Sequence, residues 1–283
     1  MTKEAKNTAL QHNHPPKQTR PPGVHLIMHP AKKAAMADPR DLPPPPADLL
    51  AGASLFLDFD GTLVELAERP EAVTVDVALG RLLAYLGQRL GGRVALVSGR
   101  AIVTLDGFLG SAGAALGMVG SHGAETRLAG GAIERPERPP ALDRAVALFT
   151  NRFGARDGVV VETKPLGVGL HYRLAPDVEP EAHALVEDFA RENALHVQHG
   201  KMMVELRLPG HDKGSAIVAL LARAPFAGHR PVFLGDDLTD EAGFAACAAH
   251  GGAGVLVGSP RVTEARYCLP DVAAVHAFLG AAR

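Results

Sequence analysis

Two acidic segments of this sequence have the residue types and spacing for metal-assisted chemistry. The first is Asp58-Phe59-Asp60-Gly61, which continues an apolar run from Ala53. Alternate residues of a strand point to the same side, so both carboxylates should project together where the strand ends. Ligands bind at that edge in open parallel sheets. Two carboxylates this close repel each other unless they hold a cation or share a proton, which favours a functional site over a chance loop.

The second acidic segment, 235–241, also follows an apolar strand, Val232–Leu234. Asp236 is the first acidic residue after that strand, and we expect it to lie close to Asp58 at the same edge of the sheet. Asp240 and Glu241 could instead favour a helix N-terminus through the helix dipole. Carboxylate oxygens with open positions beside them suit Mg²⁺, which keeps several waters and binds phosphate oxygens.

Two further residues could bind the oxygens of a phosphoryl group. Ser98 ends the apolar run Val94–Val97, and Lys213 opens a helix. Taken alone, Ser98 is equally well explained as a helix cap, and Lys213 as a surface lysine. Beside the acids, they supply a hydroxyl donor and a fixed cation for phosphoryl oxygens.

The elements that must position these residues alternate between strands and helices. Strands are predicted at 53–60 and 93–98, and the pattern returns after Asp212 with strands at 231–235 and 254–257. This alternation is typical of a parallel sheet with helical crossovers. Between the two halves, strands adjoin directly, which predicts an inserted α+β module. The fold class is therefore α/β, a Rossmann-like parallel-sheet hydrolase core with an inserted α+β cap domain. The predicted boundaries are 51–123 and 209–283 for the core and 124–208 for the cap.

Composition narrows the function classes. The 283 residues carry 29 Lys and Arg against 31 Asp and Glu, a net charge of −2, with 5% aromatic residues and no Trp. Neither a nucleic-acid surface nor a membrane surface is expected, and no obligate protein partner is evident. The absence of a spanning segment and of a disulfide framework makes the cytoplasm the expected location. Residues 1–50 hold 10 of the 22 prolines and are predicted to be a disordered tail.

Alternation within the predicted cap strands gives its sheet one apolar and one charged face. In 201–208, Lys201, Glu205 and Arg207 share a side with Met203, and in the strand before Pro165, Glu162 and Lys164 share a side. A solvated face with cross-strand ion pairs is an open alternative for each of these residues.

These motifs resemble a known family. The order Asp-x-Asp-Gly-Thr-Leu, strand-end Ser, Lys and Gly-Asp-Asp-x-x-Asp is similar to that of the haloacid dehalogenase superfamily of phosphotransferases. Within it, the segments 121–125, 164–173, 199–206 and 235–244 resemble the trehalose-6-phosphate phosphatase family over about 53–281. No P-loop, dinucleotide-binding spacing or Gly-x-Ser-x-Gly elbow competes with this interpretation.

The resemblance implies roles for the core residues. Asp58 would be the nucleophile that forms an aspartyl phosphate, and Asp60 the general acid and base. We expect the carboxylates near Asp60 to keep it partly protonated. Mg²⁺ would be held by Asp58, Asp236 and the backbone carbonyl of Asp60. Ser98 and Lys213 would hold phosphoryl oxygens, and Asp240 would orient the metal's waters or Lys213.

The resemblance also implies that the cap binds the glucose unit distal from the phosphate. The implied substrate-binding residues are Glu162, Lys164, Arg173, Lys201 and Glu205, with His171 and His122 as weaker candidates. The expected activity is Mg²⁺-dependent hydrolysis of trehalose 6-phosphate. The alternatives are a phosphatase of another sugar phosphate, such as sucrose phosphate or mannosyl-phosphoglycerate, and a non-catalytic sugar-phosphate sensor.

Overall fold

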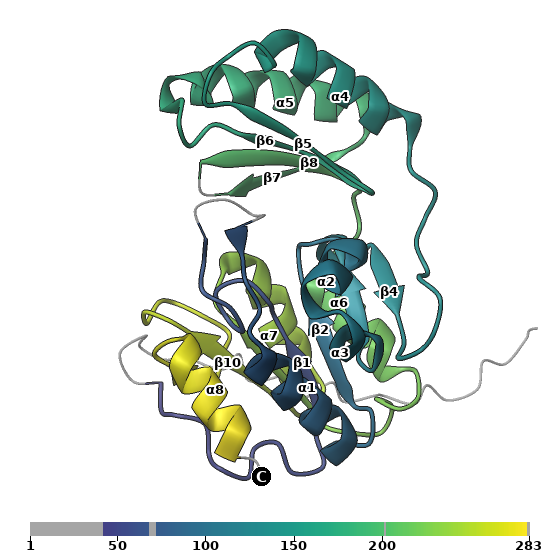
Figure 1. The fold of residues 1–283 in the computed structure, drawn as a ribbon, viewed down its shortest axis with the longest axis vertical. Coiled ribbons are helices and arrows are strands. Elements are labelled where there is room, and N and C mark those ends of the chain that lie inside the picture. Colours follow the sequence, from purple (N-terminus) through teal and green to yellow (C-terminus); the bar gives the residue numbers. More distant parts are fainter. Residues whose placement is uncertain (1–41, 68–71, 201, 282–283) are drawn as a thin grey trace, which may run out of the picture. The chain divides into compact units, whose positions relative to one another are not determined.

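The computed structural model describes residues 42–67, 72–200 and 202–281. It contains a seven-stranded sheet and a separate four-stranded sheet. This division confirms the α/β fold class predicted from the sequence (Figure 1).

The seven-stranded sheet has the order β11-β10-β9-β1-β2-β3-β4. All neighbouring pairs are parallel except β3 and β4. Its strands are β1 (Ser54–Leu57), β2 (Val94–Val97), β3 (Gly117–Gly120), β4 (Glu125–Arg127), β9 (Pro231–Gly235), β10 (Ala253–Val257) and β11 (Tyr267–Leu269). Strands β1, β2, β9 and β10 are buried along their whole length, as expected of a sheet covered on both faces.

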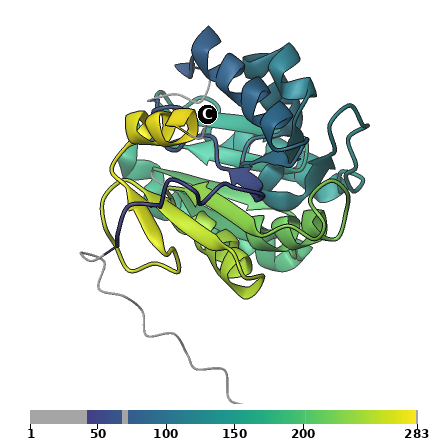
Figure 2. The same cartoon turned by 90° about the horizontal axis from the view of Figure 1, so that it is seen from below.

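Helices cover both faces of this sheet (Figure 2). Apolar residues of α1, α2 and α8 pack on one face, and those of α6 and α7 pack on the other. The core helices are α1 (Val77–Arg89), α2 (Ile102–Leu109), α3 (Ser111–Ala114), α6 (Lys213–Leu221), α7 (Glu241–Ala249) and α8 (Val272–Ala281). Short 3₁₀ turns η3 (Ser121–Gly123) and η5 (Leu238–Asp240) follow β3 and β9.

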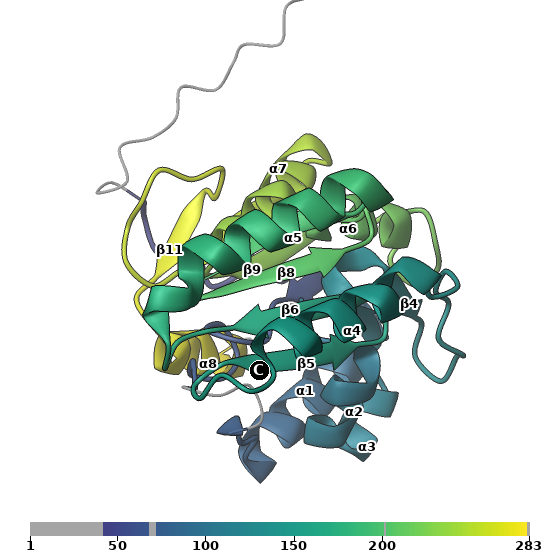
Figure 3. The ribbon, with the colours of Figure 1, turned by 90° about the horizontal axis from the view of Figure 1, so that it is seen from above.

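The cap consists of an antiparallel sheet of order β5-β6-β8-β7 with two helices on one face (Figure 3). Its elements are α4 (Pro140–Phe153), β5 (Val160–Lys164), β6 (Gly167–His171), η4 (Pro176–Val178), α5 (Glu179–Asn193), β7 (His196–Gly200) and β8 (Met203–Arg207). Val168, Leu170, Val204 and Leu206 are buried beneath the helices and form a separate core. The predicted apolar face of the cap sheet is confirmed.

Two predicted boundaries need correction. Glu125–Arg127 forms β4 of the core sheet, so the predicted cap start at residue 124 is too early, and the cap begins after that strand. A short strand cannot be assigned to one of two sheets by its own pattern, because the partner strand decides.

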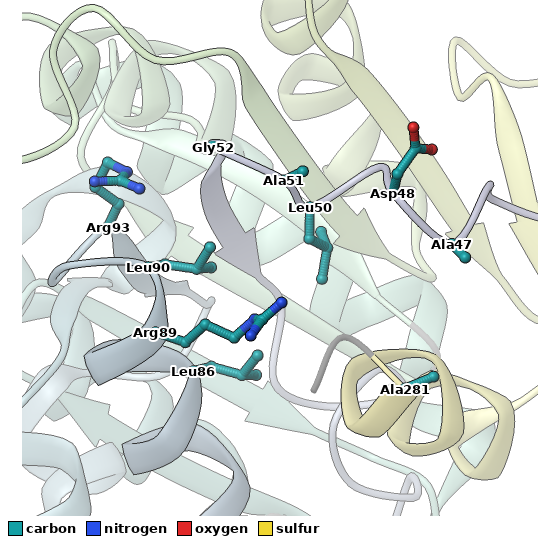
Figure 4. Close-up of a pocket in the computed structure, with 10 residues that line it drawn as sticks. All are labelled: Ala47, Asp48, Leu50, Ala51, Gly52, Leu86, Arg89, Leu90, Arg93 and Ala281. Carbon is teal, nitrogen blue, oxygen red and sulfur yellow. The ribbon is translucent and has the colours of Figure 1, made fainter.

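The predicted disordered tail over 1–50 is wrong for its last residues. Leu49 and Leu50 are buried, and the Cys268 backbone N–H donates to the Pro43 carbonyl at 3.1 Å. Residues 1–41 lie outside the described part of the chain. Residues 47, 48 and 50–52 also line a cavity of about 570 Å³, together with the end of α1 and Ala281 (Figure 4). Since Gly52 and Arg93 precede β1 and β2, this cavity lies at the amino edge of the sheet, opposite the predicted site.

Candidate active site

Three of the predicted catalytic or metal-binding side chains lie at the ends of three neighbouring strands, at one edge of the sheet. In the order β9-β1-β2, Asp236 follows β9, Asp58 follows β1 and Ser98 follows β2. Because these strands are parallel, their carboxyl ends meet at the same edge. The convergence that the sequence predicted for the core residues is therefore present in the fold.

Lys213 connects the carboxylates. Its Nζ donates to Asp58 Oδ1 at 2.7 Å and to Asp240 Oδ1 at 2.6 Å, and all three side chains are buried. Burial alone would lower the pKa of Lys213, but Asp240 and Asp58 raise it instead, so the lysine stays charged. Asp212 places this lysine by capping α6, since its carboxylate accepts from the Ser215 backbone N–H. Lys213 is a structural centre of the site and not a surface lysine.

Both carboxylate oxygens of Asp240 accept hydrogen bonds from protein groups. Oδ1 accepts from Lys213, and Oδ2 accepts from the Asp237 backbone N–H at 2.9 Å. Asp237 itself caps the turn η5. The geometry suits Asp240 to the orienting role predicted for it.

The carboxylates carry more negative charge than the lysine offsets. Oxygens of Asp58, Asp236 and Asp240 all lie within 4.8 Å of one another. Burial, with the neighbouring carboxylates, raises the pKa of Asp58 well above its usual range, although Lys213 opposes the shift. Burial and Asp240 raise the pKa of Asp236 to about 6. Three acids against one lysine leave a buried negative site that fits a cation with hard oxygen ligands.

Asp60 has a partner that sequence reasoning missed. Arg100 donates through its Nε to Asp60 Oδ2 at 2.6 Å and through a terminal nitrogen to Oδ1 at 2.7 Å. The guanidinium also lies over the rings of Phe59 and Phe108. The sequence predicts that neighbouring carboxylates keep Asp60 partly protonated, and the structure places the cation of Arg100 against Asp60 instead. The available signal was the position of Arg100 two residues beyond Ser98 at a strand end.

Ser98 is buried, and its hydroxyl oxygen accepts from the Arg100 backbone N–H at 3.1 Å. The Ser98 backbone carbonyl accepts from the His122 N–H. Ser98 therefore shapes the turn that carries Arg100, and its own hydroxyl proton is available to an acceptor at the sheet edge.

His122, a weaker candidate from the sequence, lies beside Lys213 in a cavity of about 180 Å³. Gln198 and Arg207 of the cap line the same cavity, which therefore lies between the core and the cap. Burial and the cations Lys213 and Lys164 lower the pKa of His122 well below its usual range, so the imidazole is neutral at neutral pH. Its backbone has φ = 54°, a conformation that is uncommon for a residue other than glycine.

The charged face of the cap carries a compact network. Lys164 Nζ donates to Glu205 Oε2 at 2.5 Å and lies 3.8 Å from Glu162 Oε2. His171 contacts the same Glu162 oxygen at 2.8 Å. Burial would lower the pKa of Lys164, but Glu205 and Glu162 raise it. Four of the predicted or weaker candidate residues thus meet on one face.

The other two candidates in the cap are Arg173 and Lys201. Arg173 is exposed in the turn after β6, and Lys201 lies outside the described residues. Arg100 of the core contributes to lowering the pKa of Glu162, after His171 and Lys164, and it opposes the raised pKa of Lys164.

Comparison with known proteins is consistent with this geometry. Residues 56–271 match the model of the trehalose-phosphatase family. The chain belongs to this family. A probable trehalose-phosphate phosphatase of Sinorhizobium fredii is 38% identical over 232 residues, which cover 81% of this chain and 86% of the relative. Trehalose-6-phosphate phosphatase of Escherichia coli is 36% identical over 234 residues, covering 82% and 87%.

A solved structure agrees with this assignment to the trehalose-phosphatase family. The crystal structure of a trehalose-6-phosphate phosphatase related protein superposes with a TM-score of 0.70 at 29% identity, covering 80% of this chain and 95% of that one. In the described residues, no helix is long and apolar enough to cross a membrane.

The geometry of the carboxylate site requires glycine at position 61. Its φ is +77°, and a Cβ built there would lie 2.2 Å from Asp236 Oδ2. We expect Gly61→Ala to displace Asp236, lowering turnover at least about tenfold and stability by about 1–2 kcal/mol, the usual cost of this backbone region. Phosphate release and thermal unfolding measure the two effects.

The matched control is Gly107→Ala. Gly107 lies in the middle of α2, and a Cβ built there meets nothing within 4 Å. Alanine is the better helix former, so this variant should keep full activity and gain slight stability. Equal behaviour of the two variants would contradict the assignment of Gly61 to the carboxylate site.

Proposed function

We propose that this protein hydrolyses trehalose 6-phosphate to trehalose and orthophosphate. The observation that supports the proposal is the cluster of Asp58, Asp236 and Asp240, two of which bind the buried Lys213, together with a cap face of paired charges. The names of the relatives at 36–38% identity support the choice of substrate.

Magnesium is the proposed cofactor. Asp58, Asp236 and the backbone carbonyl of Asp60 would hold it, and the excess of buried carboxylates fits an oxygen-coordinated divalent ion. When bound, it would neutralise negative charge between the nucleophile and the phosphoryl group. Thr62 would keep Asp236 in place, since its hydroxyl donates to Asp236 Oδ1 at 3.3 Å.

In the first step, a carboxylate oxygen of Asp58 attacks phosphorus and forms an aspartyl phosphate, while the bond to the sugar oxygen breaks. Lys213 already contacts Asp58, so its ammonium can orient the nucleophile and bind a phosphoryl oxygen. Ser98 would donate to another phosphoryl oxygen. Positioning and charge stabilisation account for most of the catalysis in such transfers.

Asp60 protonates the departing sugar oxygen and then accepts a proton from the water that hydrolyses the aspartyl phosphate. Both Asp60 oxygens accept from Arg100 in this structure, so at least one must be released before Asp60 can act. The phosphoryl group of the substrate could replace Asp60 as the partner of Arg100, because guanidinium groups bind phosphate oxygens in the same forked geometry. Arg100 would thus move from the acid to the substrate.

The cap would recognise the sugar hydroxyls. Glu162 and Glu205 both pair with Lys164, and a sugar would replace some of these contacts with contacts to its own hydroxyls. Arg173 and Lys201 are proposed for the same role from the sequence resemblance. A site built for hydroxyls rejects analogues that leave its buried polar groups unpaired, which would give the enzyme its specificity.

A phosphate-release screen tests the proposal. The purified chain is assayed against trehalose 6-phosphate, sucrose 6-phosphate, mannosyl-phosphoglycerate and glucose 6-phosphate, with MgCl₂ or with chelator. We expect turnover to be highest for trehalose 6-phosphate and to fall at least about 10²-fold with chelator, because charge neutralisation at phosphorus is lost. A preference for another sugar phosphate would replace the substrate assignment. No release with any substrate would support the sensor alternative.

A further inference from the structure

Two histidines and a glutamate meet on the helix-covered face of the cap. His183 and Glu187 lie one turn apart on α5, and His199 lies on the edge strand β7. His199 is paired with Val204, which is buried beneath the helices, whereas the neighbouring Gln198 is paired with Glu205 on the catalytic side. The cap sheet therefore separates this cluster from the proposed active site (Figures 1 and 3).

The three side chains have the spacing of a metal site. One ligand atom from each lies within 4.8 Å of the other two, and His199 Nε2 lies 3.7 Å from Glu187 Oε1. The two imidazole rings have centroids 4.7 Å apart. Ligands at about 2.0–2.1 Å from a tetrahedral zinc lie roughly 3.4 Å from each other. About half of the Glu187 and His199 side chains is exposed, so small rotations would close the remaining distance.

A buried tyrosine orients the first of these ligands. The Tyr172 hydroxyl contacts His183 Nε2 at 2.7 Å and donates to Glu179 Oε1 at 3.3 Å. If the phenol proton points to Glu179, the hydroxyl accepts from Nε2–H, which leaves the Nδ1 lone pair of His183 for an ion. Metal-binding histidines commonly have such a partner on the second ring nitrogen.

We infer that His183, Glu187 and His199 bind a transition-metal ion of the Zn²⁺ type that fastens the edge strand β7 to α5. Two imidazoles and one carboxylate suit zinc, nickel or copper, whereas magnesium prefers oxygen ligands alone. Water would complete the coordination on the exposed side. The ion stabilises the cap and takes no part in the reaction, and the inference does not depend on the substrate proposed above.

Zinc titration of the full chain tests the site. The protein is stripped with chelator, dialysed into excess MgCl₂ to occupy the core carboxylates, and titrated with ZnCl₂ in a calorimeter. We expect one zinc equivalent, with affinity at least tenfold weaker in His199→Ala and in Glu187→Gln. Both substituted side chains are half exposed, so the cap core is left intact. Zinc should also raise the thermal midpoint of the wild type but not of these variants.

The matched control is His196→Ala. His196 belongs to the same strand, but it is paired with Arg207 and therefore faces the other side of the sheet. This variant should bind zinc as the wild type does. The inference is overturned if the wild type binds no zinc under excess magnesium, if His199→Ala and Glu187→Gln bind as tightly as the wild type, or if His196→Ala loses binding equally.

Discussion

Asp58→Asn should abolish phosphatase activity without unfolding the protein. The amide cannot attack phosphorus, so we expect turnover of trehalose 6-phosphate to fall by at least about 10³-fold, as for removal of other nucleophiles. The fold should persist because asparagine has the same shape and its Oδ1 can still accept from Lys213, as Asp58 does now. Phosphate release under saturating magnesium measures the loss.

Thermal unfolding separates this effect from a folding defect. Burial raises the pKa of Asp58 above its unfolded value, so the ionised form of this group opposes folding at neutral pH. Removing that charge should leave the midpoint unchanged or raise it when chelator is present. Asp188→Asn is the matched control, since Asp188 is exposed on α5 and pairs with Arg191 of the adjacent turn. A variant that is both inactive and strongly destabilised would not support Asp58 as nucleophile.

The core site was predictable because the place of each of its residues follows from the few residues next to it in the sequence. Asp58, Ser98 and Asp236 each follow a fully buried strand, and the carboxyl ends of parallel strands meet at one edge. The sequence does not state which strands are neighbours. The alternating pattern nevertheless restricts the order enough that these three positions converge.

The missed features depend on tertiary partners. The pairing of Arg100 with Asp60 spans 40 positions and requires that the turns after β1 and β2 face each other. Strand β7 (His196–Gly200) is an edge strand that is largely exposed, so it lacks the apolar alternation that marks a strand. The segment 42–50 is rich in proline and has only a few apolar side chains, yet Leu49 and Leu50 are buried against the core.

Proline content alone could not exclude such packing. An irregular segment is ordered wherever an existing core offers an apolar surface and partners for its backbone groups. The Pro43 carbonyl finds its partner in the Cys268 N–H, and the Leu49 carbonyl finds one in Arg230. The composition of the segment does not reveal which donors and which apolar surface the rest of the protein offers it.

Glu205→Gln should separate sugar recognition from phosphoryl transfer. Glu205 is buried on the charged face of the cap and pairs with Lys164, whose ammonium would lose its closest anionic partner. We expect kcat/KM for trehalose 6-phosphate to fall by about 30- to 5,000-fold, which corresponds to the roughly 2–5 kcal/mol typical of truncating one member of a buried charge pair at a binding surface. Turnover of a small aryl phosphate, which has no sugar to contact the cap, should change by less than about threefold.

Steady-state kinetics on the two substrates give this comparison directly. Glu181→Gln is the matched control, because Glu181 lies on α5, on the other face of the cap sheet, where it pairs with Arg152. It should leave both substrates unaffected. Equal losses on the sugar phosphate and the aryl phosphate in Glu205→Gln would mean that the glutamate supports the core chemistry or the fold. In that case the charged face of the cap would not be the sugar site, although Asp58 and its neighbours could still transfer phosphate.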